Sequence, residues 1–297
     1  RFFCVLEEVL IMATGNEAAH APTAGEYIVH HLTQLNTTGH AQESVIDFSV
    51  LNIDTLFFSV FLGIVGLFFM WRVARSATSG VPGRMQAAVE IVLEMVNNQA
   101  KAIVHSEESR KFVGPLALTV FVWIFLLNAM DLIPVDLLPM LWAKISGNEH
   151  AYLRVVATAD LNGTLGMSIG VLLVCLYYNV KIKGLGGWVH ELCTAPFGSH
   201  PLLYPVNFAF QMIEFVAKTV SHGMRLFGNM YAGELVFMLI ALMGAAWAGT
   251  ATGAFLWIGH IFAGTVWALF HLIIITLQAF IFMMLTLVYV GQAHESH

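Results

Sequence analysis

Apolar residues occur in long runs along this chain. Residues 55–71, 112–130 and 161–180 contain no Asp, Glu, Lys or Arg. A helix needs about 20 apolar residues to cross the hydrocarbon core of a membrane, with a lower limit near 17. Each run therefore predicts one spanning helix.

The last third of the chain has a different pattern. Residues 235–294 contain no Asp, Glu, Lys or Arg, and small residues interrupt the run at 244–254. We interpret this interruption as a turn between two long helices at 205–243 and 255–290. At ~1.5 Å per residue, each helix would be roughly 50–60 Å long, against a hydrocarbon core of about 30 Å. The two helices are therefore expected to be strongly tilted.

The stretch after Ser79-Gly80-Val81-Pro82 has helical amphipathic spacing. Its apolar positions are Met85, Val89, Val92, Val96 and Ile103. Such a helix could pack on the same protein or lie on the membrane surface. We favour the surface because the flanking segments both enter lipid.

Together with these runs, the composition predicts an all-α membrane protein with five membrane-crossing helices and one interfacial amphipathic helix. Hydrophobic residues make up 58% of the chain and charged residues 11%, with a mean hydropathy of +0.75. So few charges could not cover a soluble protein of this size, which excludes ordinary soluble enzymes. The net charge of −6 offers no basic face for nucleic acid. Cys4, Cys175 and Cys193 are too far apart in sequence to suggest a metal site.

The distribution of basic residues predicts the orientation. Residues 72–111 hold six Lys or Arg, whereas residues 12–54 hold none. By the positive-inside rule, the N-terminus lies outside and the C-terminus in the cytoplasm. Residues 1–54 then form an extracytoplasmic segment and residues 55–297 a single membrane domain. We interpret Met12 as the native start, with residues 1–11 not native.

Arg225 is the most informative charge, because a guanidinium stays charged even at membrane depth, where charge is unfavourable. At 100° per residue, several polar side chains fall on its face of the helix. They are Gln211, Glu214, Lys218, Ser221 and Asn229. Glu234 lies about 180° around the helix and ~13 Å along it, which separates two polar regions.

The last helix carries His260, His271 and Gln278 nearly in line. If the two long helices pack antiparallel, His271 could approach Glu234 and form a proton relay, since imidazole titrates near neutral pH. An ordinary hydrogen bond between helices is the alternative for His271 and the favoured interpretation for His260. Lys218 could pair with Glu214 at i,i+4.

Four polar residues mark the outer ends of the second and third spans. They are Asp131, Asp136, Asp160 and Asn162. We favour solvated helix ends, with the acidic mouth of an outer proton path as the alternative. The sequence also lacks GxxxxGK[ST], GxGxxG, HExxH and CxxC, so we expect no nucleotide cofactor, no catalytic metal and no thiol redox chemistry.

One segment carries a specific resemblance. Residues 224–235, Met-Arg-Leu-Phe-Gly-Asn-Met-Tyr-Ala-Gly-Glu-Leu, resemble the signature of subunit a from the membrane sector of bacterial F-type ATP synthases. Further segments agree at residues 52–54, 78–83, 130–139 and 274–282. The resemblance extends from about Gly25 to the C-terminus.

The resemblance implies a proton-channel stator with two offset half-channels that load and unload protons on a ring of c subunits. Arg225 would face that ring, and Asn229, Glu234, His271 and Gln278 would belong to the outer path. Where many bacterial relatives have Glu, this chain has Gln211, so the inner path would be lined by Glu214, Ser221 and His222.

Implied partners are the c ring, the b subunits of the peripheral stalk, the remaining ATP synthase complex and lipid, in a bacterial inner membrane. Two alternatives remain at this point. One is a secondary proton-coupled transporter, against which stands the lack of an internal repeat. The other is a structural scaffold, which leaves Arg225 and Glu234 unexplained.

Overall fold

A computed structural model describes residues 25, 28, 32–37, 49–134, 137–147, 153–198, 200–245 and 250–292. Within these ranges the regular elements are helices, and five are long and apolar enough to cross a membrane. The five are α3 (Ile53–Arg75), α5 (Glu107–Ala129), α7 (Leu161–Thr194), α8 (Tyr204–Ala245) and α9 (Ala251–Gln292). The predicted all-α membrane fold is confirmed. The division at residue 54 stays a prediction, and Cys4 and residues 1–11 lie outside the described ranges.

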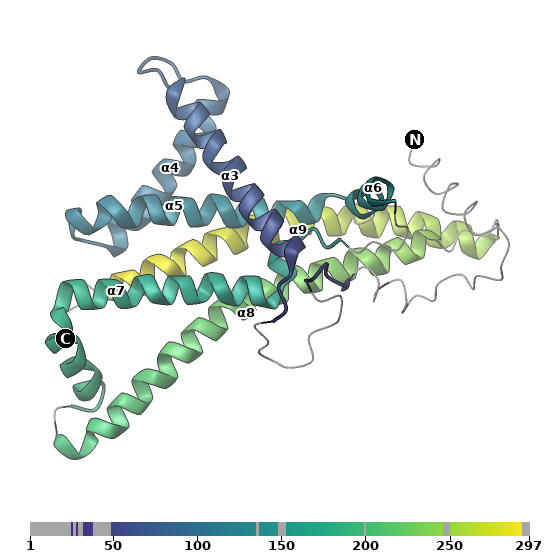
Figure 1. Ribbon diagram of the computed structural model, residues 1–297. Coiled ribbons are helices and arrows are strands. Elements are labelled where there is room, and N and C mark those ends of the chain that lie inside the picture. The colour runs from purple at the N-terminus through teal and green to yellow at the C-terminus, as the bar shows by residue number, and fades with distance from the viewer. Residues whose placement is uncertain are drawn as a thin grey trace.

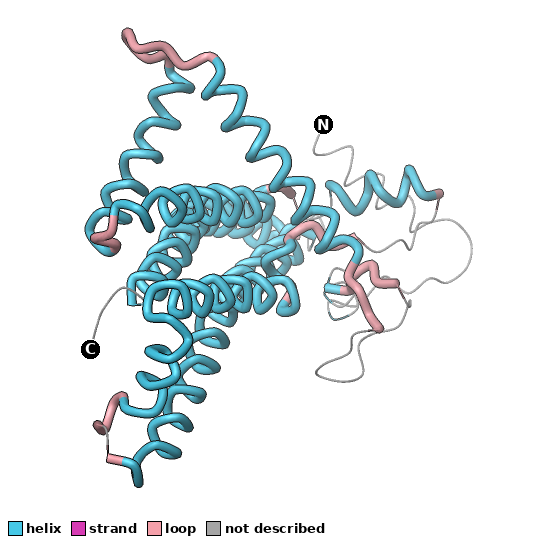
Figure 2. The backbone as a smooth tube through the Cα atoms, turned by 60° about the vertical axis from the view of Figure 1, so that its left-hand side comes forward, coloured by secondary structure: helices cyan, strands magenta, loops and turns pink. Residues whose placement is uncertain are grey.

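Helices α8 and α9 have 42 residues each and run antiparallel along almost the whole molecule (Figure 1). Helix α7 packs on α8, and α5 packs on α9 (Figure 2). The core between these helices contains Ile124, Leu226, Met230, Met283 and Leu287. The predicted lengths of α8 and α9 are confirmed, whereas their tilt in a membrane stays a prediction.

Helices α3 and α4 (Arg84–Ile103) form a hairpin whose tip projects from the side of this body (Figure 2). Near the C-terminal end of α4, Val96 and Ala100 are buried where the helix contacts α5 and α9. Toward its N-terminal end, Met85 and Ile91 are exposed. The amphipathic helix is therefore present and packs partly on its own protein, while the expected membrane contact of its exposed half stays a prediction.

Short polar motifs begin two of the spanning helices. The Ser106 hydroxyl accepts a hydrogen bond from the Ser109 N–H at 3.4 Å and starts α5. The Asp160 carboxylate accepts one from the Asn162 N–H at 3.0 Å and starts α7. Side chains of this kind satisfy helix N–H groups that have no partner within the helix.

In the described part of the chain, four short helices connect the long ones: η1 (Met130–Leu132), α6 (Leu137–Ser146), η2 (Ala157–Ala159) and η3 (Pro201–Leu203). The sequence interpretation did not include α6, because 10 residues are too few for a span. Helix α6 lies on the side of the molecule toward the connection between α8 and α9 (Figure 1), whereas η2 contacts α3, α5, α7 and α8.

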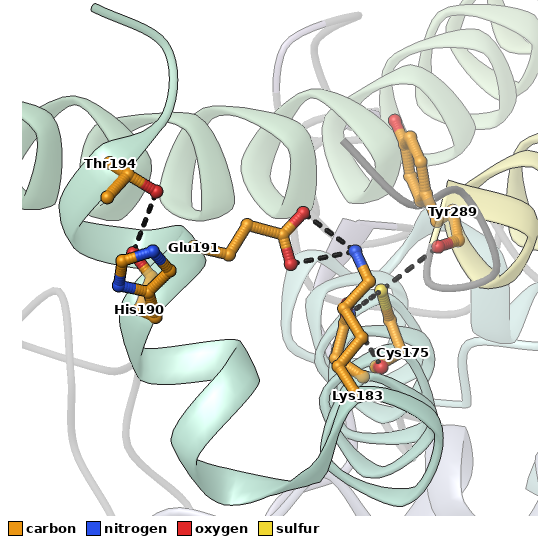
Figure 3. A network of polar contacts seen from close by, with 7 residues as sticks. Cys175, Lys183, His190, Glu191, Thr194 and Tyr289 are labelled. Atoms are coloured by element: carbon orange, nitrogen blue, oxygen red, sulfur yellow. Dashed lines mark hydrogen bonds and ion pairs between the residues drawn. The ribbon is translucent and has the colours of Figure 1, made fainter. Parts of the chain in front are cut away.

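Helix α7 is longer than predicted and bends sharply beyond the predicted span. Gly184 has φ 70° and ψ 160°, a backbone conformation that is essentially restricted to glycine. Both carboxylate oxygens of Glu191 lie 2.7 Å from the Lys183 Nζ, so an ion pair joins the two sides of the bend (Figure 3). The Cys175 thiol donates to the Tyr289 carbonyl at 3.1 Å and links α7 to α9 (Figure 3).

Candidate functional site

Arg225 lies on the outward-facing side of α8. The side chain is exposed, as are Ser221 and Glu214 on the same face. The Asn229 side-chain amide donates to the Arg225 carbonyl at 2.8 Å. Within the described ranges, the guanidinium itself makes no hydrogen bond or ion pair. The helix therefore presents a fixed positive charge on a surface that another chain can contact.

Glu214 forms the predicted ion pair with Lys218, with 2.6 Å between Oε1 and Nζ. The Lys218 ammonium also donates to the Gln292 side-chain carbonyl at 2.9 Å and lies 5.6 Å from the centre of the Tyr289 ring. These contacts connect the outward face of α8 to the last turns of α9. The pair is half-exposed, so it contributes little to stability by itself.

Glu234 occupies the opposite, inward face of α8, as the helical arithmetic predicted. The Arg154 guanidinium donates to Glu234 Oε2 at 2.6 Å, and both side chains are more than nine-tenths buried. Sequence reasoning missed Arg154. One signal in the sequence could have identified Arg154. It is a basic residue in the connection between the second and third spans, which the positive-inside rule places outside, where basic residues are less common.

His271 lies beside this pair but has its own partner. His271 Nε2 lies 2.6 Å from Asp131 Oδ2, and both side chains are buried. Gly233 provides the space, since a Cβ atom there would lie 2.3 Å from His271 Cε1. Glu234 and His271 therefore lie on adjoining parts of the site, each beside a charged side chain from another element, and the expected relay between them stays a prediction.

A cavity lies beside the Arg154–Glu234 ion pair and the Asp131 carboxylate. Asp131, Arg154 and Glu234 line it together with apolar residues from η1, α6 and the segment before η2. The cavity has a volume of about 30 Å³. A polar cavity of this size can hold at least one water molecule. The arrangement can therefore pass a proton between buried carboxylates.

The favoured interpretation of the outer aspartates as solvated ends is wrong for two of them. Asp131 is 4% exposed and Asp160 is 5% exposed. Asp160 accepts a hydrogen bond from the Asn52 amide at 2.8 Å as well as from the Asn162 N–H. Each carboxylate lies against another element, Asp131 against His271 of α9 and Asp160 against Asn52 before α3. Asp136 lies outside the described residues.

The remaining predicted residues divide between the two faces. Gln278 is buried on α9, two turns beyond His271. His222 is also buried, with its ring centre 3.8 Å from that of Phe282, so it faces the interior and not the outward face that carries Ser221.

His260 contacts the Ile240 carbonyl at 2.6 Å, consistent with the favoured interpretation of an ordinary hydrogen bond between helices. Within the described ranges, no three His, Cys, Asp or Glu residues are grouped as metal ligands.

These observations define the protein as a multi-pass α-helical membrane protein with buried ionisable groups within its two longest helices. Residues 56–291 match the family model of the ATP synthase A chain. The chain belongs to this family.

Curated relatives agree over nearly the whole sequence. Proteins named ATP synthase subunit a from Acidovorax sp. (strain JS42) and Paracidovorax citrulli (strain AAC00-1) are 66% and 65% identical over 285 and 290 residues. A relative of the same name from Verminephrobacter eiseniae (strain EF01-2) is 59% identical over 286 residues. Each match covers 94% of this chain and 99% of the relative.

Proposed function

We propose that this chain, the proton-translocating stator subunit of an F-type ATP synthase, supplies two offset half-channels on opposite faces of α8. The observation that carries the proposal is the placement of Arg225 and Glu234. Nine residues apart on one helix, the arginine is exposed and the carboxylate is buried in an ion pair. A permanent charge thus separates a buried proton-accepting site from the outward surface.

The outer half-channel begins at the cavity between Asp131, Arg154 and Glu234. A proton reaches Glu234 through water in this cavity, and the Asp131–His271 pair supplies a second acceptor beside it. Gln278 and Asn229 lie along α9 and α8 beyond these groups and lead toward the face that carries Arg225. From there the proton passes to a carboxylate on the rotor.

Arg225 acts as an electrostatic barrier between the two paths. A fixed positive charge in a low-dielectric region repels a proton that would cross directly. The same charge attracts each ionised rotor carboxylate as it arrives, so that the rotor can leave only after its carboxylate is protonated again. Each proton that crosses 100 mV releases about 2.3 kcal/mol, so several are needed per ATP.

The inner half-channel follows the exposed part of α8 on the other side of Arg225. Glu214 and Ser221 lie on the same outward face as Arg225 and can receive the proton that the rotor releases. His222 faces the interior, and its ring packs on Phe282 and Tyr289. His222 therefore packs on the inward side of this segment of α8, and Ser221 and Glu214 line the inner half-channel.

The partners follow from the exposed surfaces. The outward face of α8 contacts the c ring, and the exposed apolar helices α3 and α4 are available to lipid and to the b subunits. The chain forms no covalent bond and is the non-catalytic, proton-conducting part of the complex. Its orientation is N-terminus outside and C-terminus in the cytoplasm of a bacterial inner membrane, because the basic connection between α3 and α5 faces the cytoplasm.

The test is proton flux in membrane vesicles that contain the assembled complex. Arg225→Ala should abolish ATP-driven pumping and allow a passive leak once the catalytic sector is removed. Glu234→Gln should slow flux by about tenfold or more without a leak, because it removes one proton-transfer group. Arg84→Ala, which removes an exposed charge at the start of α4, is the matched control. Unchanged pumping in both site variants would refute the two-path mechanism.

A further inference from the structure

Arg154 is a buried arginine in a connection far in sequence from the helix that it contacts. Its side chain is 7% exposed, and it lies 80 residues before Glu234. Because a guanidinium cannot lose its proton, the charge needs a permanent counter-charge in the protein. Among the described residues, Nη2 finds that counter-charge on Glu234, whereas Nε has no hydrogen-bond partner.

Asp54 fixes the backbone that carries this arginine. Its Oδ2 atom accepts hydrogen bonds from the Arg154 N–H at 3.1 Å and from the Leu35 N–H at 2.9 Å. Its Oδ1 atom accepts one from the Thr55 N–H at 2.8 Å. Asp54 thereby ties the loop before η2 to the start of α3, and it is itself 1% exposed.

The guanidinium is also placed from the side of α8. Its central carbon lies 5.6 Å from the centre of the Tyr231 ring, and Tyr231 precedes Glu234 by one helical turn. An arginine against an aromatic face keeps its orientation. The α3 start, the loop and α8 therefore all determine where the guanidinium meets the carboxylate.

Several charged groups surround Glu234 at this point. Arg154 approaches from the loop, and Asp131 lines the same cavity from η1. On α9, His271 approaches the adjoining Gly233 and pairs with Asp131. Arg154 is therefore the cation that faces Glu234 directly, while the nearby histidine is engaged with another carboxylate.

We propose that Arg154 is a positioning residue of the outer proton path, which holds the Glu234 carboxylate at the cavity wall and supplies its counter-charge. The proposal rests on the function proposed above. Each proton that Glu234 accepts removes the counter-charge of Arg154, so the pair favours rapid release of that proton. A group with this property relays protons and does not store them.

The first test is a set of variants measured for passive proton conduction in vesicles from which the catalytic sector is removed. Arg154→Gln should lower conduction by about 10-fold to 100-fold, because the Glu234 side chain loses its position. Arg154→Lys keeps the charge and should recover a large part of the loss. Arg110→Gln removes a partly exposed arginine that pairs with Glu107 at 3.6 Å, and it should leave conduction unchanged.

The second test separates positioning from a merely structural role. If Arg154 acts through Glu234, Arg154→Gln adds no further loss of conduction to Glu234→Gln. The double variant should also reach the membrane in larger amounts than Glu234→Gln alone, because that single variant leaves a buried guanidinium without counter-charge. The pH dependence of conduction should change in Arg154→Gln and stay near that of the wild type in Arg154→Lys.

The outcomes distinguish this proposal from the function on which it rests. If Arg154→Gln conducts normally while Glu234→Gln does not, the positioning role is wrong and the half-channel stands. Additive losses in the double variant would also overturn the positioning role. If Glu234→Gln conducts normally, the half-channel itself is wrong. Where Arg154→Gln fails to assemble, the comparison of Glu234→Gln with the double variant still decides the matter.

Discussion

His271 Nε2 on α9 and Asp131 Oδ2 on η1 lie 2.6 Å apart with both side chains almost completely buried, and they form an ion pair when the imidazole is protonated. The pair is placed by Gly233, since a side chain there would occupy the position of the imidazole. Ring contacts from Phe237 and Trp267 surround the imidazole further, with ring centres 5.2 and 6.1 Å away. Glu234 follows Gly233 in the sequence, so a change in the packing of His271 against Gly233 also affects the carboxylate that is proposed to transfer protons.

We expect Gly233→Ala to displace His271, because the new Cβ would lie 2.3 Å from His271 Cε1. Overpacking of this kind typically costs about 1–3 kcal/mol, and proton conduction should fall with it. The measurement is conduction in stripped vesicles at equal amounts of assembled complex. Gly170→Ala on α7, where no atom lies within 4 Å of the new Cβ, is the control and should conduct normally. Normal conduction in both would mean that the position of His271 does not matter.

Replacing Asp131 tests the pair from its other end. Asp131→Leu leaves the buried imidazole without its carboxylate partner, and a buried polar group that loses its partner costs about 1–3 kcal/mol. We expect less assembled complex and lower conduction per complex, whereas Asp131→Glu should retain more of both. Immunoblots of membranes together with flux assays give the two quantities. Equal behaviour of the Leu and Glu variants would show that the charge at this site is not needed.

The carboxylate at position 214 is expected to serve the inner path. Glu214→Gln should reduce ATP-driven pumping by about 100-fold, because it removes a proton-transfer group, and should cause no passive leak, because Arg225 is intact. Gln211→Glu combined with Glu214→Gln moves the carboxylate by about one turn on the same face, and it should restore pumping. Glu90→Gln on α4 is the control. Failure of the double variant to recover would restrict the function to position 214 itself.

The bend in α7 depends on the backbone of Gly184. Gly184→Ala places a Cβ on a residue with φ 70° and ψ 160°, which costs roughly 1–3 kcal/mol. Gly186→Ala lies two residues on without a positive φ and should be tolerated. The thermal stability of the purified complex measures the difference. Equal stability of the two variants would show that the bend is not required.

Cysteine labelling tests the proposed orientation. In intact cells whose outer membrane is permeable, a membrane-impermeant maleimide should label Lys144→Cys on α6 and spare Val81→Cys, which is 95% exposed at the tip of the α3–α4 hairpin. In inverted membrane vesicles the pattern should reverse. Both variants need a background in which Cys193 is replaced. The opposite pattern would place the N-terminus inside.

The spanning helices and the faces of α8 depend on residues close together in the sequence, so both could be predicted from the sequence. Apolar runs of sufficient length require helices in lipid, because no water is present there to satisfy backbone groups. The same reasoning separated Arg225 from Glu234, since both lie on one helix and helical geometry fixes the angle between them. The lysine at 218 paired with Glu214 for the same local reason.

Tertiary structure decided which residues meet at the buried site. Arg154 reaches Glu234, and Asp131 reaches His271, across 80 and 140 residues of sequence. No helical periodicity connects a loop residue to a helix on the other side of the bundle, so neither pairing could be predicted from spacing. Asp131 and Asp160 are also buried against distant segments, beside His271 and Asn52. Sequence therefore determined the helices and their faces, while packing between distant segments determined the partners of each charge.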